Sequence, residues 1–120
     1  MIENHIVYVL TNPAMPNLVK IGKTTQADIS IRLSQLYSTG VPLPFHCAYA
    51  AEVEDCHQAE KALHIAFGPY QINPKREFFQ IDPEQAIAIL KLLEKKNVSN
   101  EVNKDLNKEV SDAEMKSAKN

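Results

Sequence analysis

The sequence predicts a single small α/β domain, and three observations support this fold class. Residues 6–10 (Ile-Val-Tyr-Val-Leu) form a continuous β-branched and aromatic run, which is typical of a strand buried on both faces. Residues 28–37 and 55–67 carry apolar side chains at helical spacing. A chain of 120 residues, 44% of them hydrophobic, suits one domain with a modest core.

Two more strands and one extended segment are expected after the first strand. Residues 18–21 follow a turn rich in proline and asparagine, and this short connection favours antiparallel pairing with the first strand. Gly22 then allows a tight turn or the close approach of a ligand to the backbone. Residues 45–53 form the longest strand, and residues 76–81 form a short strand or an extended segment.

Three helices are expected, and each has a recognisable start. Asp28 and Asp55 can cap the first two helices through their side-chain oxygens. The third begins at residues 82–85 (Asp-Pro-Glu-Gln), which combine a cap, a proline at the first helical position and a glutamine three residues after the cap. The lysines between residues 91 and 96 suit the negative C-terminal end of this helix.

Composition limits the classes of function. The 13 basic and 15 acidic residues give a net charge of −2, so bulk charge does not hold this protein on nucleic acid, and any polyanion site must be a local patch. Cys47 and Cys56 form no metal-ligand pattern and are interpreted as buried hydrophobic residues. The N-terminus does not resemble a signal peptide and no stretch is long enough to span a membrane, so we expect a cytoplasmic protein.

The composition changes at residue 97, which divides the chain into a domain of residues 1–96 and a polar tail of residues 97–120. Val98, Val102 and Leu106 recur at every fourth position of the tail. The tail is therefore either disordered in isolation or a weakly amphipathic helix that forms against a partner. It is a candidate site for a protein partner.

Residues 19–24 (Val-Lys-Ile-Gly-Lys-Thr) indicate phosphodiester chemistry. Cleaving a phosphodiester requires a group that activates water, cations that stabilise negative charge and usually a metal held by carboxylate. Six candidates lie on or beside predicted core elements: Tyr8, Lys20, Lys23, Arg32, Glu60 and His64. Each also has an ordinary interpretation, since a tyrosine in a strand can be a core residue and lysines or arginines can be solvated.

A second grouping lies on the predicted helix of residues 55–67. His57, Glu60 and His64 are spaced i, i+3 and i+7, so they share one face of the helix. This face is either a metal-binding triad or a polar helix face beside the apolar stripe.

Tyr8, residues 19–24 and Arg32-Leu33 resemble the GIY-YIG nuclease superfamily. The likeness is strongest to a branch of small phage and bacterial domains in which the second motif commonly reads Lys-Ile-Gly. Residues 60–64 (Glu-Lys-Ala-Leu-His) and 76–79 (Arg-Glu-Phe-Phe) also match this branch, and the resemblance covers about residues 5–95. It implies a three-stranded antiparallel sheet flanked by helices.

The resemblance also implies roles for the residues on the first two strands and the helix after them. Tyr8 would act as general base or orient the attacking water, which requires a nearby cation because a phenol ionises only near pH 10. Lys20 stands where the second-motif tyrosine usually lies, and Lys23 matches the lysine after that motif. Either would supply positive charge, or act as a base if desolvated. Arg32 matches the arginine that contacts the scissile phosphate.

Glu60 matches the glutamate that binds a single Mg²⁺ or Mn²⁺. His64 would support this metal site or help to protonate the leaving oxygen. The chain departs from the family pattern because it lacks the second-motif tyrosine and the glycine of the first motif. Asn73 is the one nearby candidate for a late asparagine that many members carry, and Glu77 is an alternative polar residue.

The implied function is a metal-dependent endonuclease acting on DNA that is single-stranded, branched or damaged. This hypothesis requires Tyr8, Arg32 and Glu60 to converge on one cleft, with Tyr8 and Glu60 on the same face of the sheet. One alternative is a nucleic-acid-binding or interaction module with the same fold, which binds through Lys20, Lys23 and Arg32 without catalysis. Another is a metal-binding or structural protein organised by the histidine–glutamate face.

Overall fold

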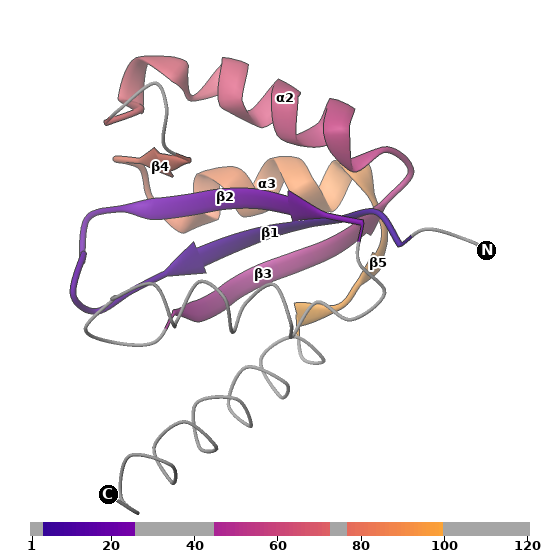
Figure 1. Ribbon diagram of the computed structural model, residues 1–120, viewed down its shortest axis with the longest axis horizontal. Helices are drawn as coiled ribbons and strands as arrows, with labels where there is room; N and C mark the ends of the chain where they lie inside the picture. The colour runs from indigo at the N-terminus through magenta and orange to yellow at the C-terminus, as the bar shows by residue number, and fades with distance from the viewer. Residues whose placement is uncertain (1–3, 26–44, 73–76, 100–120) are drawn as a thin grey trace, which may run out of the picture.

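The computed structural model describes residues 4–25, 45–72 and 77–99, which form a five-stranded sheet with two helices (Figure 1). The strands are β1 (Ile6–Thr11), β2 (Val19–Thr24), β3 (His46–Val53), β4 (Phe78–Phe79) and β5 (Glu94–Asn97). The helices are α2 (Cys56–Ala66) and α3 (Pro83–Leu93), with a 3-10 turn, η1 (Gly68–Tyr70), after α2. The strand order is β4-β2-β1-β3-β5 and every pair is antiparallel. The predicted α/β class is confirmed, but the sheet has five strands instead of three.

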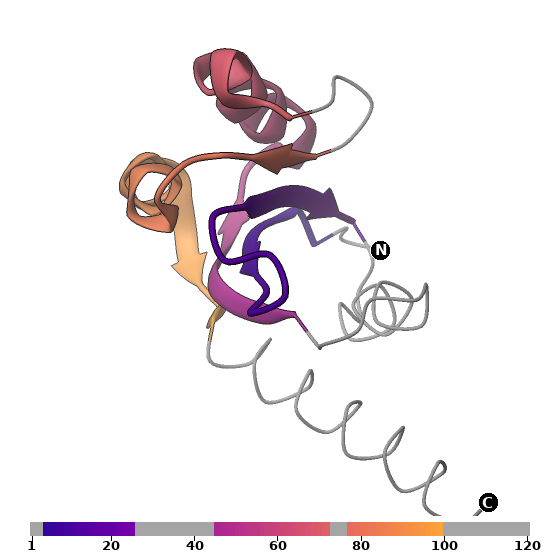
Figure 2. The same ribbon diagram turned by 90° about the vertical axis from the view of Figure 1, so that its left-hand side faces the viewer.

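The central strand β1 is the most deeply buried element. Its residues Val7, Tyr8, Val9 and Leu10 have no exposed surface, which confirms the prediction of a strand covered on both faces. Figure 2 shows that α2 and α3 lie on the same face of the curved sheet. The sheet therefore has a helix face and an opposite face, and each carries its own apolar cluster.

Helix α2 begins where predicted, because the Asp55 side chain accepts hydrogen bonds from the backbone of the first turn. Its buried stripe consists of Cys56, Ala59, Glu60 and Leu63. Ala62 and Ala66, which the apolar spacing assigned to the core, are exposed. A carboxylate thus lies in the buried stripe while two apolar residues face solvent.

Helix α3 begins with the predicted capping box, in which Asp82 and Gln85 bond reciprocally to each other's backbone. It ends earlier than expected, because residues 94–97 leave the helix and pair with β3 as β5. Val98 is buried, and its N–H donates to the Ala50 carbonyl at 2.9 Å. The fold therefore continues past residue 96, where the composition changes.

Several expectations fall on other parts of the chain. The helix expected from Asp28, the candidates Arg32 and Asn73, and residues 100–120 lie outside the described residues. Both cysteines are free and buried, as predicted. Within the described ranges, no helix is long and apolar enough to cross a membrane.

Candidate functional site

Tyr8 and Gly22 are direct partners across the β1–β2 ladder, on the face of the sheet opposite the helices. A Cβ atom added at Gly22 would lie 2.6 Å from Tyr8 Cε2, Cζ and Oη. Only glycine therefore lets the phenol ring cross β2 at this position. The sequence predicts a tight turn or a nearby ligand at Gly22. Instead β2 continues through Gly22 to Thr24, and the group that approaches the backbone there is the Tyr8 ring.

Lys23 and Glu60 form an ion pair on the helix face. Lys23 Nζ lies 2.7 Å from Glu60 Oε1, and Glu60 is only 6% exposed. The hydrogen bond to Glu60 raises the pKa of Lys23, although burial opposes it, so the ammonium stays charged at neutral pH. Glu60 Oε2 is buried and has no hydrogen-bond partner among the described residues. This geometry suits Lys23 as a cation and not as a general base.

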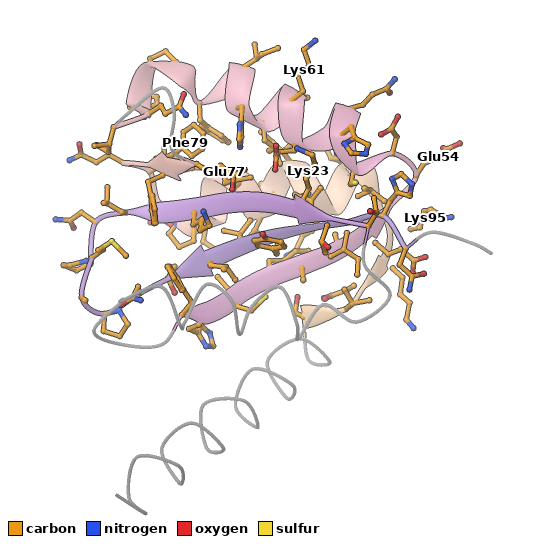
Figure 3. All side chains as sticks on the ribbon, in the orientation of Figure 1. Lys23, Glu54, Lys61, Glu77, Phe79 and Lys95 are labelled. Atoms are coloured by element: carbon orange, nitrogen blue, oxygen red, sulfur yellow. The ribbon has the colours of Figure 1, made fainter. Side chains whose placement is uncertain are left out.

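Lys20 is held on the opposite face, although it has the sequence signature of a solvated strand lysine. It is 9% exposed, its Nζ lies 3.3 Å from Glu77 Oε2, and the same atom lies 5.0 Å from the centre of the Phe78 ring. The Glu77 carbonyl also accepts a hydrogen bond from the Ile21 N–H at 3.0 Å. Figure 3 shows Glu77 between β2 and α2, beside the outer edge of the sheet.

His64 lies over β2, with its Nε2 3.1 Å from the Ile21 carbonyl oxygen and its ring 5.0 Å from that of Phe79. Its position supports the strand that carries the two lysines. His57, by contrast, is exposed and its ring packs edge-on against His5. Across the described ranges, no three His, Cys, Asp or Glu side chains are grouped closely enough to hold a metal ion. The histidine–glutamate triad is therefore not formed.

The expected single cleft with Tyr8 and Glu60 on one face is wrong. Tyr8 packs in the cluster on the opposite face, whereas Glu60 lies on α2, which covers the helix face. Successive residues of a strand point to opposite faces of the sheet. Gly22 therefore lies against Tyr8 on the opposite face, whereas the Lys23 side chain reaches Glu60 on the helix face. The candidate site therefore has two parts, Tyr8 on one face and the Lys23–Glu60 pair on the other, and strand β2 lies between them.

Strand β4 covers only part of the outer edge of β2. Strand β4 pairs with β2 only at Val19 and Lys20, and residues 22–24 extend beyond this pairing. Glu77, at the end of β4, contacts Lys20 and also raises the pKa of Lys23 through its charge. The sequence alone indicates no physical role for Glu77. The available signals are its place within the predicted strand of residues 76–81 and the match of residues 76–79 to the nuclease branch.

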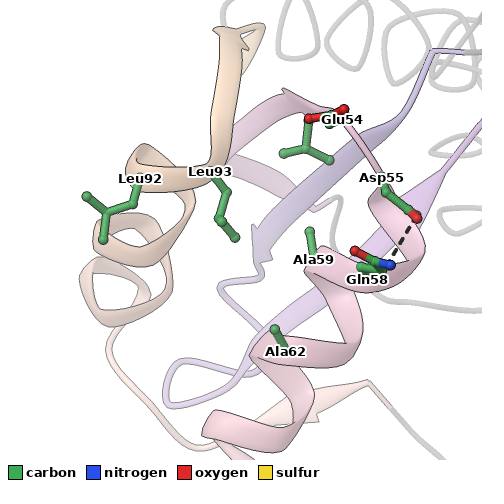
Figure 4. A pocket seen from close by; sticks show the side chains of 8 residues that line it. Glu54, Asp55, Gln58, Ala59, Ala62, Leu92 and Leu93 are labelled. Carbon is green, nitrogen blue, oxygen red and sulfur yellow. Dashed lines mark hydrogen bonds between the residues drawn. The ribbon is translucent and has the colours of Figure 1, made fainter.

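A separate groove of about 750 Å³ lies between α2 and α3 (Figure 4). Its lining residues are Val53, Glu54, Asp55, Gln58, Ala59, Ala62, Leu92 and Leu93. Its walls carry no basic side chain, and the acidic Asp55 is engaged in capping α2. None of the lysines or the tyrosine of the candidate site lines this groove, so it does not serve phosphate chemistry.

Comparison with known proteins supports an assignment at the level of the family. Residues 5–94 match the model of the T5orf172 domain, which spans three quarters of the chain. Searches of curated proteins and of solved structures found no match. The chain belongs to the T5orf172 domain family, which is associated with nuclease-like proteins of phages and bacteria.

Proposed function

We propose that this domain is a metal-dependent endonuclease that hydrolyses phosphodiester bonds in DNA. The observation that carries the proposal is the buried carboxylate of Glu60, which pairs with Lys23 through one oxygen and leaves the other without a hydrogen-bond partner. Removing a carboxylate from water is costly, and a buried ion pair is weak evidence of a stabilising role. A functional role for Glu60 accounts for this arrangement better than a structural one.

Glu60 Oε2 would be the protein's oxygen ligand to Mg²⁺ or Mn²⁺, and its lack of a hydrogen-bond partner among the described residues supports this assignment. The described residues offer no cluster of further ligands, so the cation would keep most of its waters, as Mg²⁺ commonly does. When bound, it would supply Lewis-acid stabilisation of the phosphate oxygens.

The remaining residues would act around the edge of β2. Lys23 remains protonated, so it stabilises negative charge on the phosphate. Lys20 would bind an adjacent phosphate. Tyr8 is fully buried on the opposite face, so it takes no part in activating the water, and the proposed site does not depend on a cleft shared with the metal-binding carboxylate. His64, with Nε2 engaged by a backbone carbonyl, would keep β2 in place. Arg32 would also contact phosphate, a role proposed from the sequence because this residue lies outside the described ranges.

A second candidate function is a DNA-binding module that keeps the fold without the chemistry. The separation of Tyr8 and Glu60 on opposite faces favours it, as does the lysine at residue 20 in place of the second-motif tyrosine. Such a module would bind DNA through Lys20, Lys23 and Arg32, and its binding would weaken with salt.

Nicking of supercoiled plasmid with Mg²⁺ or Mn²⁺ separates these functions. The test compares the intact protein with two variants, Glu60→Gln and Glu54→Gln. The second removes the same charge from an exposed position. The endonuclease proposal expects cleavage by the intact protein and Glu54→Gln but not by Glu60→Gln. Equal cleavage by all three would reject Glu60 as the metal ligand. DNA binding without cleavage by any of them would favour the module.

A further inference from the structure

The charged side chains at the outer edge of β2 form an alternating series. Glu60 pairs with Lys23 at 2.7 Å, and Glu77 pairs with Lys20 at 3.3 Å. Glu77 also acts on Lys23, because its charge contributes to the raised pKa of that lysine. The series runs from Glu60 and Lys23 on the helix face to Glu77 and Lys20 at the opposite face, and its four charges sum to zero. Each lysine that could bind phosphate is thus already neutralised.

The two carboxylates are held very differently. The Glu60 side chain is 8% exposed, and its pairing with Lys23 is short. The Glu77 side chain is 32% exposed, and its pairing with Lys20 is longer. The Glu77 backbone is anchored by the hydrogen bond from Ile21, so its side chain can swing away without moving β4. Glu77 is therefore the carboxylate that an incoming anion displaces more easily.

Lys20 would remain in place after this displacement. Its side chain is only 11% exposed, and its ammonium lies 5.0 Å from the Phe78 ring centre, a favourable cation–π position. An ammonium that has already lost most of its solvent and rotamer freedom pays little further entropy on binding phosphate.

We propose that Glu77 gates the phosphate site, its carboxylate occupying the place on Lys20 that a phosphodiester oxygen takes when nucleic acid binds. The inference rests on the proposed function for the identity of the ligand, but it does not require cleavage. A tethered carboxylate has a high effective concentration, so a free phosphate ion competes poorly with it. A polyanion that engages several cations at once displaces Glu77 more readily. The gate therefore favours nucleic acid over small phosphates.

The test measures equilibrium binding of a short fluorescent DNA duplex by anisotropy, over a series of NaCl concentrations and with EDTA present. EDTA removes divalent metal, so the result does not depend on cleavage. Glu77→Gln is expected to tighten binding by about 3- to 10-fold at low salt, because phosphate no longer has to displace a carboxylate from Lys20. Glu54→Gln makes the same change in net charge and is expected to change affinity less than 2-fold, by roughly the screened long-range contribution.

Two further variants test whether the gain passes through Lys20. Lys20→Gln is expected to weaken binding, and adding Glu77→Gln to it should give no gain. Inorganic phosphate should compete with DNA more effectively for Glu77→Gln than for the intact protein. Thermal unfolding of each variant checks that it is folded.

Four results would overturn the gate. They are unchanged or weaker binding by folded Glu77→Gln, an equal gain from Glu54→Gln, a gain that persists in the Lys20→Gln background, or no DNA binding by either the intact protein or Glu77→Gln. Failure to nick plasmid while these binding results hold would reject the endonuclease and leave the gate intact.

Discussion

The Tyr8 ring lies against the β2 backbone at Gly22, so that a side chain of any size at residue 22 would overlap it. A Cβ at Gly22 would sit 2.6 Å from three atoms of the Tyr8 side chain, and Tyr8 is completely buried. A Cβ at residue 22 could be accommodated only if this buried ring or the backbone moved. This contact links Tyr8 on β1 to Gly22 on β2, which are direct partners in the ladder.

Gly22→Ala is therefore expected to destabilise the domain by about 1–3 kcal/mol, the usual cost of overpacking a core. Gly68→Ala is the matched control, because a Cβ at Gly68 would meet no atom within 4 Å, and a change within about 0.5 kcal/mol is expected there. Urea denaturation measures both. Adding Tyr8→Ala should make Gly22→Ala less costly, and purely additive losses would contradict the contact.

The Lys23–Glu60 pair predicts an asymmetric response to mutation. Lys23→Met would leave Glu60 buried without its compensating charge, at a cost of about 2 kcal/mol or more. Combining it with Glu60→Leu replaces the pair by apolar side chains and should recover most of this loss. Chemical denaturation of the single and double variants measures the coupling. Lys61→Met, at an exposed position on the helix that carries Glu60, should change stability little. A loss of stability as large as that of Lys23→Met would contradict the role given to the ion pair.

Tyr49 predicts a loss of stability at high pH. Burial, and then the hydrogen bond that its hydroxyl donates to Glu94, raise the pKa of Tyr49 to about 12. Above about pH 10 the unfolded chain releases this proton while the folded chain retains it, so stability falls as pH rises from 10 to 12. Tyr49→Phe should flatten this decline. Tyr70→Phe, at a side chain that is 54% exposed, should leave it unchanged in melts recorded across this range.

Cys47 predicts slow thiol chemistry in the folded state. Burial raises the pKa of its thiol to about 12, and burial also raises the pKa of Cys56. Since the thiolate is the reactive form, a maleimide at pH 8 should label neither cysteine quickly, and both should react once denaturant unfolds the chain. Mass spectrometry after timed quenching measures this. Rapid labelling of the native protein would show that these sites open without unfolding.

Several elements were predictable because the signal is local. The β-branched run at residues 6–10 produces a fully buried strand, since no polar side chain interrupts it. Asp55 caps α2, and residues 82–85 start α3, because these caps depend only on neighbouring backbone groups. The candidate residues Lys20, Lys23, Glu60 and His64 lie around β2, a grouping that sequence spacing alone did not predict.

The sequence by itself determined the fully buried strand β1, the starts of α2 and α3, and which residues alternate along each strand. Only the tertiary structure decided which face of the sheet α2 covers, and hence that Tyr8 and Glu60 lie on opposite sides of β2. Residues 94–97 (Glu-Lys-Lys-Asn) have little strand propensity, yet they form β5 because β3 offers an open edge of backbone hydrogen-bonding groups. The pairing of Lys20 with Glu77 joins residues 57 positions apart. Such contacts follow from packing the whole chain, and no local pattern encodes them.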